Sequence, residues 1–162
     1  MGDVLVSELS RAFEEEKARK ETIEKRGLGV LTSASAFITT IFAVAAAVSD
    51  KRDWPASATV LLISGACLLL LSGGLGLYCS AAPRAYLRID PRSLLTLAAP
   101  LQWGLEGDDA SRQFALARVH ILRQWTAKNQ STAKVLATAV FVELIGVFLS
   151  SSSLLPLVAH KI

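Results

Sequence analysis

Hydrophobic and polar positions along this chain fall into separate blocks. Residues 1–27 contain thirteen charged side chains, whereas residues 29–48 and 56–82 contain none. Residues 135–158 contain a single one, Glu143. Each apolar block reaches the roughly 20 residues that a helix needs to cross the hydrocarbon core of a bilayer. Buried helices of a soluble protein are the alternative, but uncharged runs of this length favour membrane spans. The pattern therefore predicts an all-α membrane protein with three transmembrane helices per chain.

The same pattern divides the 162 residues into five segments. We expect an N-terminal helix in residues 1–27 and a transmembrane hairpin in residues 28–82. A polar helical segment in residues 83–131 then leads into a third transmembrane helix in residues 132–158. Residues 159–162 form a short tail.

Lysine and arginine are unevenly distributed among the segments that flank the spans. Residues 1–27 carry six and residues 79–131 carry seven, whereas residues 49–55 carry two and the tail carries one. Segments rich in lysine and arginine near spans tend to stay in the cytoplasm. We therefore expect the N-terminus and the polar segment inside the cell, and the hairpin loop and the C-terminus outside.

The N-terminal segment is predicted to form one helix over residues 3–26. Apolar residues recur at helical spacing in its first turns, namely Leu5, Leu9, Ala12 and Phe13. Acid-before-base pairs at i,i+4 follow, namely Glu15–Arg19, Glu16–Lys20 and Glu21–Lys25. Two interpretations remain open: a solvated helix that leads into the first span, or a helix whose apolar stripe packs against copies of itself.

The polar segment is predicted to contain two helices. Asp90 and Pro91 are typical of a helix start, and this short helix should end near Ala98. Asp108 or Asp109 then caps a second helix, which continues without a helix breaker into the third span. Four basic residues lie along it: Arg112, Arg118, Arg123 and Lys128. They either hold the orientation of the chain in the membrane or bind an anionic ligand such as a nucleotide.

Small and hydroxylated residues mark the first two spans. In the first span they recur at i,i+4 as Ser35, Thr39, Ala43 and Ala47. In the second span, Ser72 and Gly76 have the spacing of a close contact between membrane helices. The GGLG sequence beside them is not a phosphate-binding loop, because such loops follow a strand and open a soluble helix.

Glu143 lies about 12 Å into the third apolar block, at 1.5 Å per residue. An acidic residue at the centre of a span costs on the order of 3 kcal/mol on insertion scales. Its face of the helix is small or hydroxylated: Thr132, Ala139, Glu143, Gly146, Ser150 and Ser153. Such a face requires either another helix or water.

Three interpretations of this face remain open. Several copies around an axis could line an ion-conducting pore with Glu143, Ala139, Gly146 and Ser150, together with Thr39 of the first span. Alternatively, a protonated Glu143 donates a hydrogen bond within its own chain, to a carbonyl, Thr39 or Thr40. In the third interpretation Glu143 carries protons, although proton coupling usually uses more intramembrane titratable groups.

The sequence contains no recognisable set of catalytic residues. The two cysteines and two histidines lie far apart, so no metal site or cofactor is expected. No nucleophile, base and orienting group occur together, and we expect a protein that is not an enzyme. Cys79 is either a palmitoylation site next to the membrane or a small buried residue.

The layout resembles the membrane effector domains of Pycsar systems and the related SLATT domains. The matching features are the hairpin joined by DKRDWPAS, the basic helix ARVHILRQWTAKNQ and its unbroken passage into STAKVLATAVFVEL. The channel subunits of the Hailong system are similar in concept to these effectors. The resemblance covers most of the chain and rests on architecture.

The resemblance implies a role in bacterial antiphage defence at the inner membrane. A partner nucleotidyltransferase or cyclase would make a nucleotide or short oligonucleotide, and a homo-oligomer, with four copies as the family expectation, would depolarise the membrane. No binding of duplex nucleic acid is expected. The signal would meet residues 84–128 or the N-terminal helix. A membrane scaffold or accessory subunit that binds a cytoplasmic protein without conducting ions is the alternative.

Overall fold

The computed structural model describes residues 2–49, 55–81 and 107–159. These residues form three helices: α1 (Gly2–Ser49), α2 (Ala56–Ala81) and α5 (Gly107–Ala159). The short helix predicted near residues 91–98, the hairpin loop at residues 50–54 and the end of the tail lie outside the described residues. Pro55 stands just before α2, where its carbonyl accepts a hydrogen bond from the Thr59 amide at 3.2 Å. Pro55 thus precedes the first residue of α2, where proline is well tolerated.

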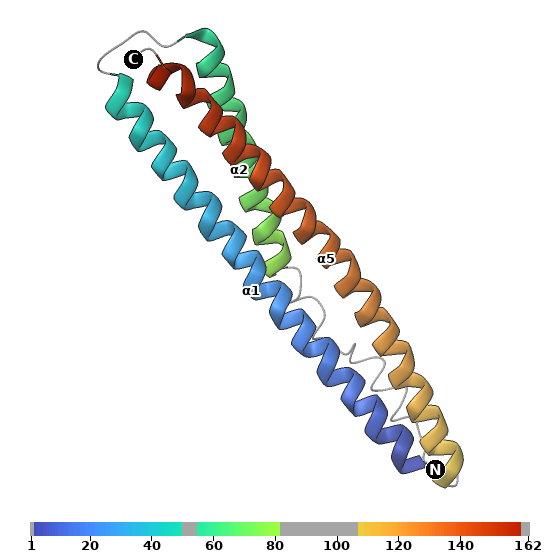
Figure 1. Cartoon of the computed structure of the whole chain (residues 1–162). Coiled ribbons are helices and arrows are strands. Elements are labelled where there is room, and N and C mark those ends of the chain that lie inside the picture. Colours follow the sequence, from blue (N-terminus) through green and yellow to red (C-terminus); the bar gives the residue numbers. More distant parts are fainter. Residues whose placement is uncertain (1, 50–54, 82–106, 160–162) are drawn as a thin grey trace.

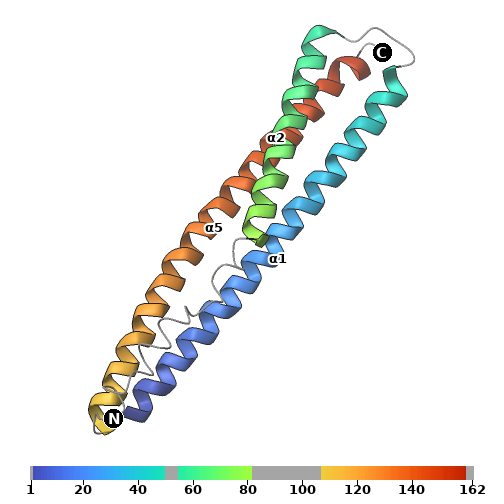
Figure 2. The same cartoon turned by 180° about the vertical axis from the view of Figure 1, so that it is seen from behind.

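The two long helices run parallel, with their N-terminal ends together at one end of the molecule (Figure 1). The opposite view shows α2 antiparallel to both and beside only their C-terminal parts (Figure 2). We call α2, residues 27–49 of α1 and residues 132–159 of α5 the three-helix half. Residues 2–26 of α1 and 107–131 of α5 form the two-helix half.

All three helices are long and apolar enough to cross a membrane, as the sequence predicts. The qualifying segments are Ser7–Ala47, Ala56–Ala81 and Arg118–Leu155. The predicted continuity of the polar segment with the third span is confirmed by α5, which runs unbroken into the three-helix half. The N-terminal helix was predicted over residues 3–26, whereas α1 continues through Gly27 into the three-helix half without a break. This all-helical architecture indicates a multi-pass membrane protein.

Salt bridges on α1 differ from the predicted ones. The structure pairs Arg11 with Glu15 at 3.2 Å, Arg19 with Glu16 at 3.7 Å, and Lys20 with Glu24 at 3.6 Å. The predicted i,i+4 pairs are not the ones that form. Glu16 turns toward α5, as described below, and Lys20 pairs with Glu24 instead. Exposed pairs of this kind differ little in energy.

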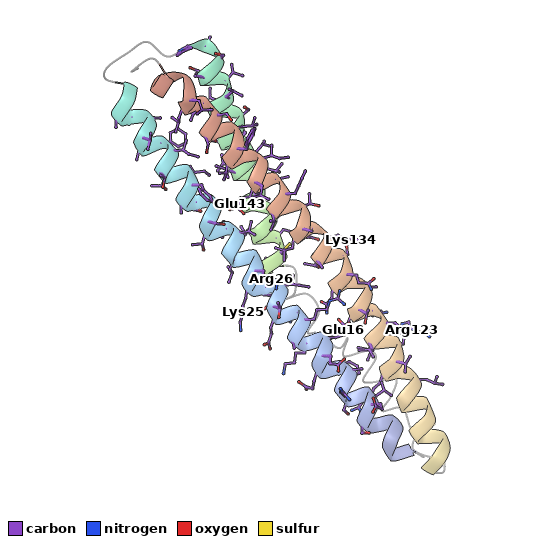
Figure 3. The ribbon with its side chains drawn as sticks, in the orientation of Figure 1. Glu16, Lys25, Arg26, Arg123, Lys134 and Glu143 are labelled. Carbon is purple, nitrogen blue, oxygen red and sulfur yellow. The ribbon has the colours of Figure 1, made fainter. Side chains whose placement is uncertain are left out.

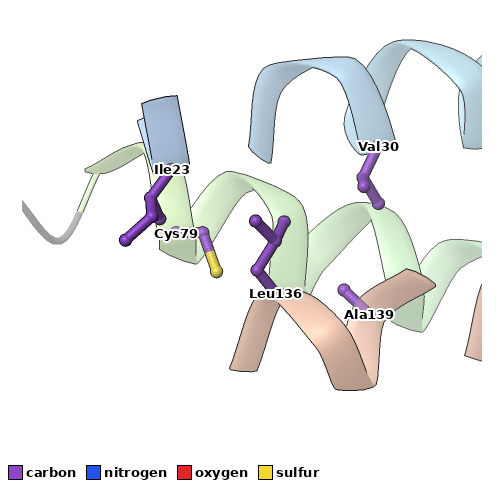
Figure 4. Close-up of a cluster of buried hydrophobic side chains, with 5 residues drawn as sticks. All are labelled: Ile23, Val30, Cys79, Leu136 and Ala139. Atoms are coloured by element: carbon purple, nitrogen blue, oxygen red, sulfur yellow. The ribbon is translucent and has the colours of Figure 1, made fainter. Parts of the chain in front are cut away.

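The hydrophobic core lies where the two halves meet. Ile23 and Val30 from α1, Cys79 from α2, and Leu136 and Ala139 from α5 form one buried cluster (Figure 4). Cys79 is fully buried, which agrees with a small packed residue rather than an exposed modification site. Its thiol donates to the Thr132 carbonyl at 3.7 Å.

Glycines let α2 approach both long helices closely. A Cβ on Gly76 would lie 2.7 Å from the Gly27 carbonyl oxygen of α1. A Cβ on Gly65 would lie 2.8 Å from the Gly146 carbonyl oxygen of α5. Ser72, between these contacts, donates to the Ala139 carbonyl at 2.8 Å. Ser72 and Gly76 are thus both at close helix contacts, but Ser72 contacts α5 and Gly76 contacts α1, so the two do not form one shared contact as their spacing predicts.

Candidate functional site

The intramembrane carboxylate is held inside the chain by a hydroxyl of the first long helix. The Ser33 hydroxyl of α1 donates to Glu143 Oε1 of α5 at 2.5 Å. Glu143 is 8% exposed, and its neighbour in this contact lies 110 residues earlier in the sequence. Figure 3 shows Glu143 within the three-helix half, away from the charged residues Lys25, Arg26 and Lys134. The intrachain interpretation named a carbonyl, Thr39 or Thr40 as the partner, whereas the structure places Ser33 there.

Ser33 can serve either protonation state of Glu143. A hydroxyl has one proton to donate and two lone pairs to accept with. Toward a carboxylate, Ser33 donates. Toward a protonated carboxyl, it accepts, and its own proton then reaches the Gly29 carbonyl at 3.0 Å or the Val30 carbonyl at 3.1 Å. The geometry therefore offers Ser33 and Glu143 a hydrogen bond with either form of the carboxyl group.

The small face of α5 packs against helices of the same chain. Ala139 and Ser150 are fully buried, and Gly146 is buried against Leu69 and Gly65 of α2. The whole predicted face is buried: Thr132, Ala139, Glu143, Gly146, Ser150 and Ser153. Another helix, rather than water, covers it within one chain. The role of these residues in a pore stays a prediction.

Thr39, the remaining predicted pore residue, lies on the outside of the molecule. Its hydroxyl donates to the Ser35 carbonyl at 2.9 Å. The stripe of small residues to which it belongs is exposed along its length: Ser35, Thr39, Ala43 and Ala47. The structure thus separates Thr39 from the Glu143 face. The i,i+4 spacing identified the stripe, but only the packing shows that none of the three described helices covers it.

The two-helix half contains a polar contact that the sequence did not reveal. Asn129 of α5 donates to Glu16 of α1, at 2.7 Å to Oε2 and 3.1 Å to the backbone carbonyl. Thr126 donates to Glu16 Oε1 at 3.2 Å. One turn away, the rings of Phe13 and Trp125 meet edge to face, with centroids 5.8 Å apart. Phe13, the last residue of the apolar stripe of α1, therefore packs against α5, which neither sequence interpretation had anticipated.

The predicted ligand-binding residues are spread around α5. Arg123 and Lys128 are exposed and Arg118 is half-buried, while the side chain of Arg112 lies outside the described residues. Positions five residues apart differ by about 140° around a helix, so Arg118, Arg123 and Lys128 point in three directions. One α5 helix therefore does not gather all of them around one ligand. Their role in binding a nucleotide stays a prediction.

Comparisons with known proteins find no match for this chain among protein-family models, curated proteins or solved structures. The described residues also contain no group of three or more His, Cys, Asp or Glu side chains that could hold a metal ion. The candidate site is therefore defined by geometry alone: the Ser33–Glu143 contact in the three-helix half and the Glu16–Asn129 contact in the two-helix half.

Proposed function

We propose that this protein is a non-enzymatic, homo-oligomeric membrane effector that conducts ions when a nucleotide-type signal reaches its two-helix half. In the resting subunit, Ser33 holds Glu143 inside the chain. In the active assembly, the contact opens and the carboxylates of several copies face the conducting path. Rings of carboxylates favour cations.

The continuity of α1 and α5 carries the proposal. Each helix joins a polar contact in the two-helix half to the intramembrane pair, from Glu16 to Ser33 in α1 and from Asn129 to Glu143 in α5. Because an α-helix is stiff along its axis, a ligand that moves the two-helix half also displaces Ser33 relative to Glu143. Interfaces of this kind switch between discrete arrangements.

Orientation and biological setting belong to the same proposal. The excess of lysine and arginine in the flanking segments supports a cytoplasmic N-terminus and an external C-terminus. The resemblance to Pycsar and SLATT-type effectors supports a place in the bacterial inner membrane, a partner nucleotidyltransferase or cyclase, and a role in antiphage defence. Arg112, Arg118, Arg123 and Lys128, supplied by neighbouring copies, would bind the anionic signal.

Exposed small residues support assembly in the membrane. Ser35, Thr39 and Ala43 let a helix of a second copy approach α1 closely. The hydroxyls of Ser35 and Thr39 already bond to carbonyls of their own helix at 2.8 and 2.9 Å. This face can therefore border either another helix or a water-filled path without burying an unpaired hydroxyl group. A tetramer is the family expectation.

Ion flux through liposomes tests the proposal. The wild-type protein should conduct cations in preference to anions, Glu143→Ala should lose that preference, and Glu143→Lys should reverse it. Ser33→Ala should raise the flux measured without signal, because it frees the carboxylate. Thr138→Ala is the matched control, since the Thr138 hydroxyl is exposed and bonds only to its own helix at 3.1 Å. Unchanged selectivity in both Glu143 variants would overturn the pore.

A non-conducting scaffold is the second candidate, and the burial of the α5 small face favours it. In that case Glu143 and Ser33 only join α1 to α5, and the two-helix half presents itself to a cytoplasmic protein. The scaffold predicts no flux from correctly folded protein at any signal concentration, and a stable complex with that partner in mild detergent. Flux from the protein alone would exclude it.

A further inference from the structure

A groove runs between α1 and α5 and is charged at one end and apolar at the other. Its volume is about 850 Å³, which is within the usual range of ligand pockets. Arg19 and Arg26 of α1 line one end, and Gly29 and Ser33 continue the same wall. On the facing helix, Ala137 and Val140 are among the lining residues.

The charged end of the groove carries a guanidinium that no described carboxylate neutralises. No carboxylate of the described residues lies within salt-bridge distance of Arg26, whose side chain is exposed. Arg19 is partly neutralised by Glu16 at 3.7 Å. Glu143 lies near Ser33, about 10 Å along the helix from Arg26, so it does not compete for that guanidinium. An anion would therefore bind chiefly at Arg26.

The groove lies across the boundary between the polar and apolar parts of α1. Arg19, Arg26 and Ser33 are seven residues apart, so they share one face and span about 21 Å along the axis. Arg26 is the last charged residue before the uncharged block. An anionic headgroup at Arg26 would thus sit at the membrane surface, with the apolar wall directed into the hydrocarbon.

We propose that this groove binds an anionic phospholipid, with the phosphate at Arg26 and Arg19 and an acyl chain along Gly29, Ala137 and Val140. Basic pockets between membrane helices are typical sites for anionic headgroups. A free nucleotide would leave the apolar wall uncovered. A second copy would have to bring a carboxylate to Arg26, whereas the membrane already supplies phosphates there. The lipid would also fill space between the two long helices.

Lipid titration followed by native mass spectrometry tests the charged end. Delipidated protein in detergent should bind phosphatidylglycerol more tightly than phosphatidylcholine, and Arg26→Gln should weaken phosphatidylglycerol binding roughly tenfold. Arg19→Gln should have a smaller effect because Glu16 already neutralises part of its charge. Lys25→Gln removes a neighbouring charge that does not line the groove, so it should bind as the wild type does. Equal losses in Arg26→Gln and Lys25→Gln would refute a specific site.

Filling the groove tests the apolar end. A Cβ on Gly29 meets no atom within 4 Å and Gly29 lines the groove, so we expect Gly29→Leu to place its side chain there. It should reduce phosphatidylglycerol binding. Gly74→Leu is the matched control, because Gly74 is equally open but lies on α2 outside the groove. Comparable thermal melts would show that both variants fold.

The remaining outcomes assign the groove to another occupant and would overturn the proposal. If Gly29→Leu changes the oligomeric state but leaves lipid binding intact, a second copy occupies the groove. If free nucleotide displaces phosphatidylglycerol, the guanidiniums serve the signal instead. Lipid binding and ion flux are measured in separate experiments. A protein that does not bind phosphatidylglycerol at this groove could still conduct ions, and a protein that does not conduct ions could still bind the lipid.

Discussion

At the scale of single residues, Glu143 is the position where chemistry and location conflict most. A carboxyl group near the centre of an apolar helix is costly, and the structure offsets that cost with one hydroxyl, Ser33, at 2.5 Å. Burial of small neighbours such as Ala139 removes the contact from lipid. The hydrogen bond explains how the chain tolerates Glu143, and its opening is what the proposed function requires.

A double-mutant cycle measures this contact. Ser33→Ala and Glu143→Ala should show a coupling free energy of about 0.5–2 kcal/mol for unfolding in detergent, the usual range for hydrogen bonds between membrane helices. Thr39→Ala with Glu143→Ala is the control cycle and should show no coupling, because Thr39 bonds only to its own helix. Coupling to Thr39 instead of Ser33 would contradict the pairing.

At the scale of helices, the contacts of α2 depend on residues without side chains. Gly65 lies so close to α5 that an added Cβ would reach 2.1 Å from Ser150 Oγ and 2.8 Å from the Gly146 carbonyl oxygen. The Ser150 hydroxyl is buried and finds no hydrogen-bond partner among the described residues, so tight packing rather than polar bonding holds this contact. The backbone of α5 cannot move away without losing the Ser72–Ala139 bond.

Substitution at Gly65 should therefore separate α2 from α5. We expect Gly65→Ala to lower the free energy of unfolding by about 1–3 kcal/mol, the usual effect of overpacking, as measured by denaturation in mixed detergent. Gly74→Ala, on the same helix, adds its methyl group to open space and should change stability far less. Similar losses in both variants would mean that glycine acts through backbone flexibility instead of close contact.

At the scale of the whole molecule, two parallel long helices place both polar helix segments at the same end (Figure 1). The end of α1 and the start of α2 lie at the other end. Labelling from one side of the membrane can therefore determine the orientation of the entire chain. The distribution of lysine and arginine predicts that the two-helix half faces the cytoplasm.

Single cysteines in a Cys67→Ser, Cys79→Ala background test that orientation. A membrane-impermeant maleimide applied to intact cells should label Ser57→Cys, at the exposed start of α2, and should not label Glu14→Cys. Gln130→Cys, exposed on α5, should behave as Glu14→Cys does because both belong to the two-helix half. The reverse pattern would place the N-terminus outside the cell.

Sequence by itself determined the three helices that can span a membrane and the unbroken passage of α5 into the third span. These features follow from local rules: charge is excluded from hydrocarbon, and helices continue where neither proline nor turn residues interrupt them. The i,i+4 pattern also identified the small face around Glu143 and the stripe around Thr39.

Tertiary structure decided what each of those faces touches. Glu143 meets Ser33 rather than Thr39, and Glu16 meets Asn129 rather than Lys20. Both contacts join α1 to α5 across more than a hundred residues. Helical periodicity shows which residues share a face, but it carries no information on which face of a distant helix lies opposite. That choice depends on packing of the whole chain, here on α2 fitting its glycines against both long helices.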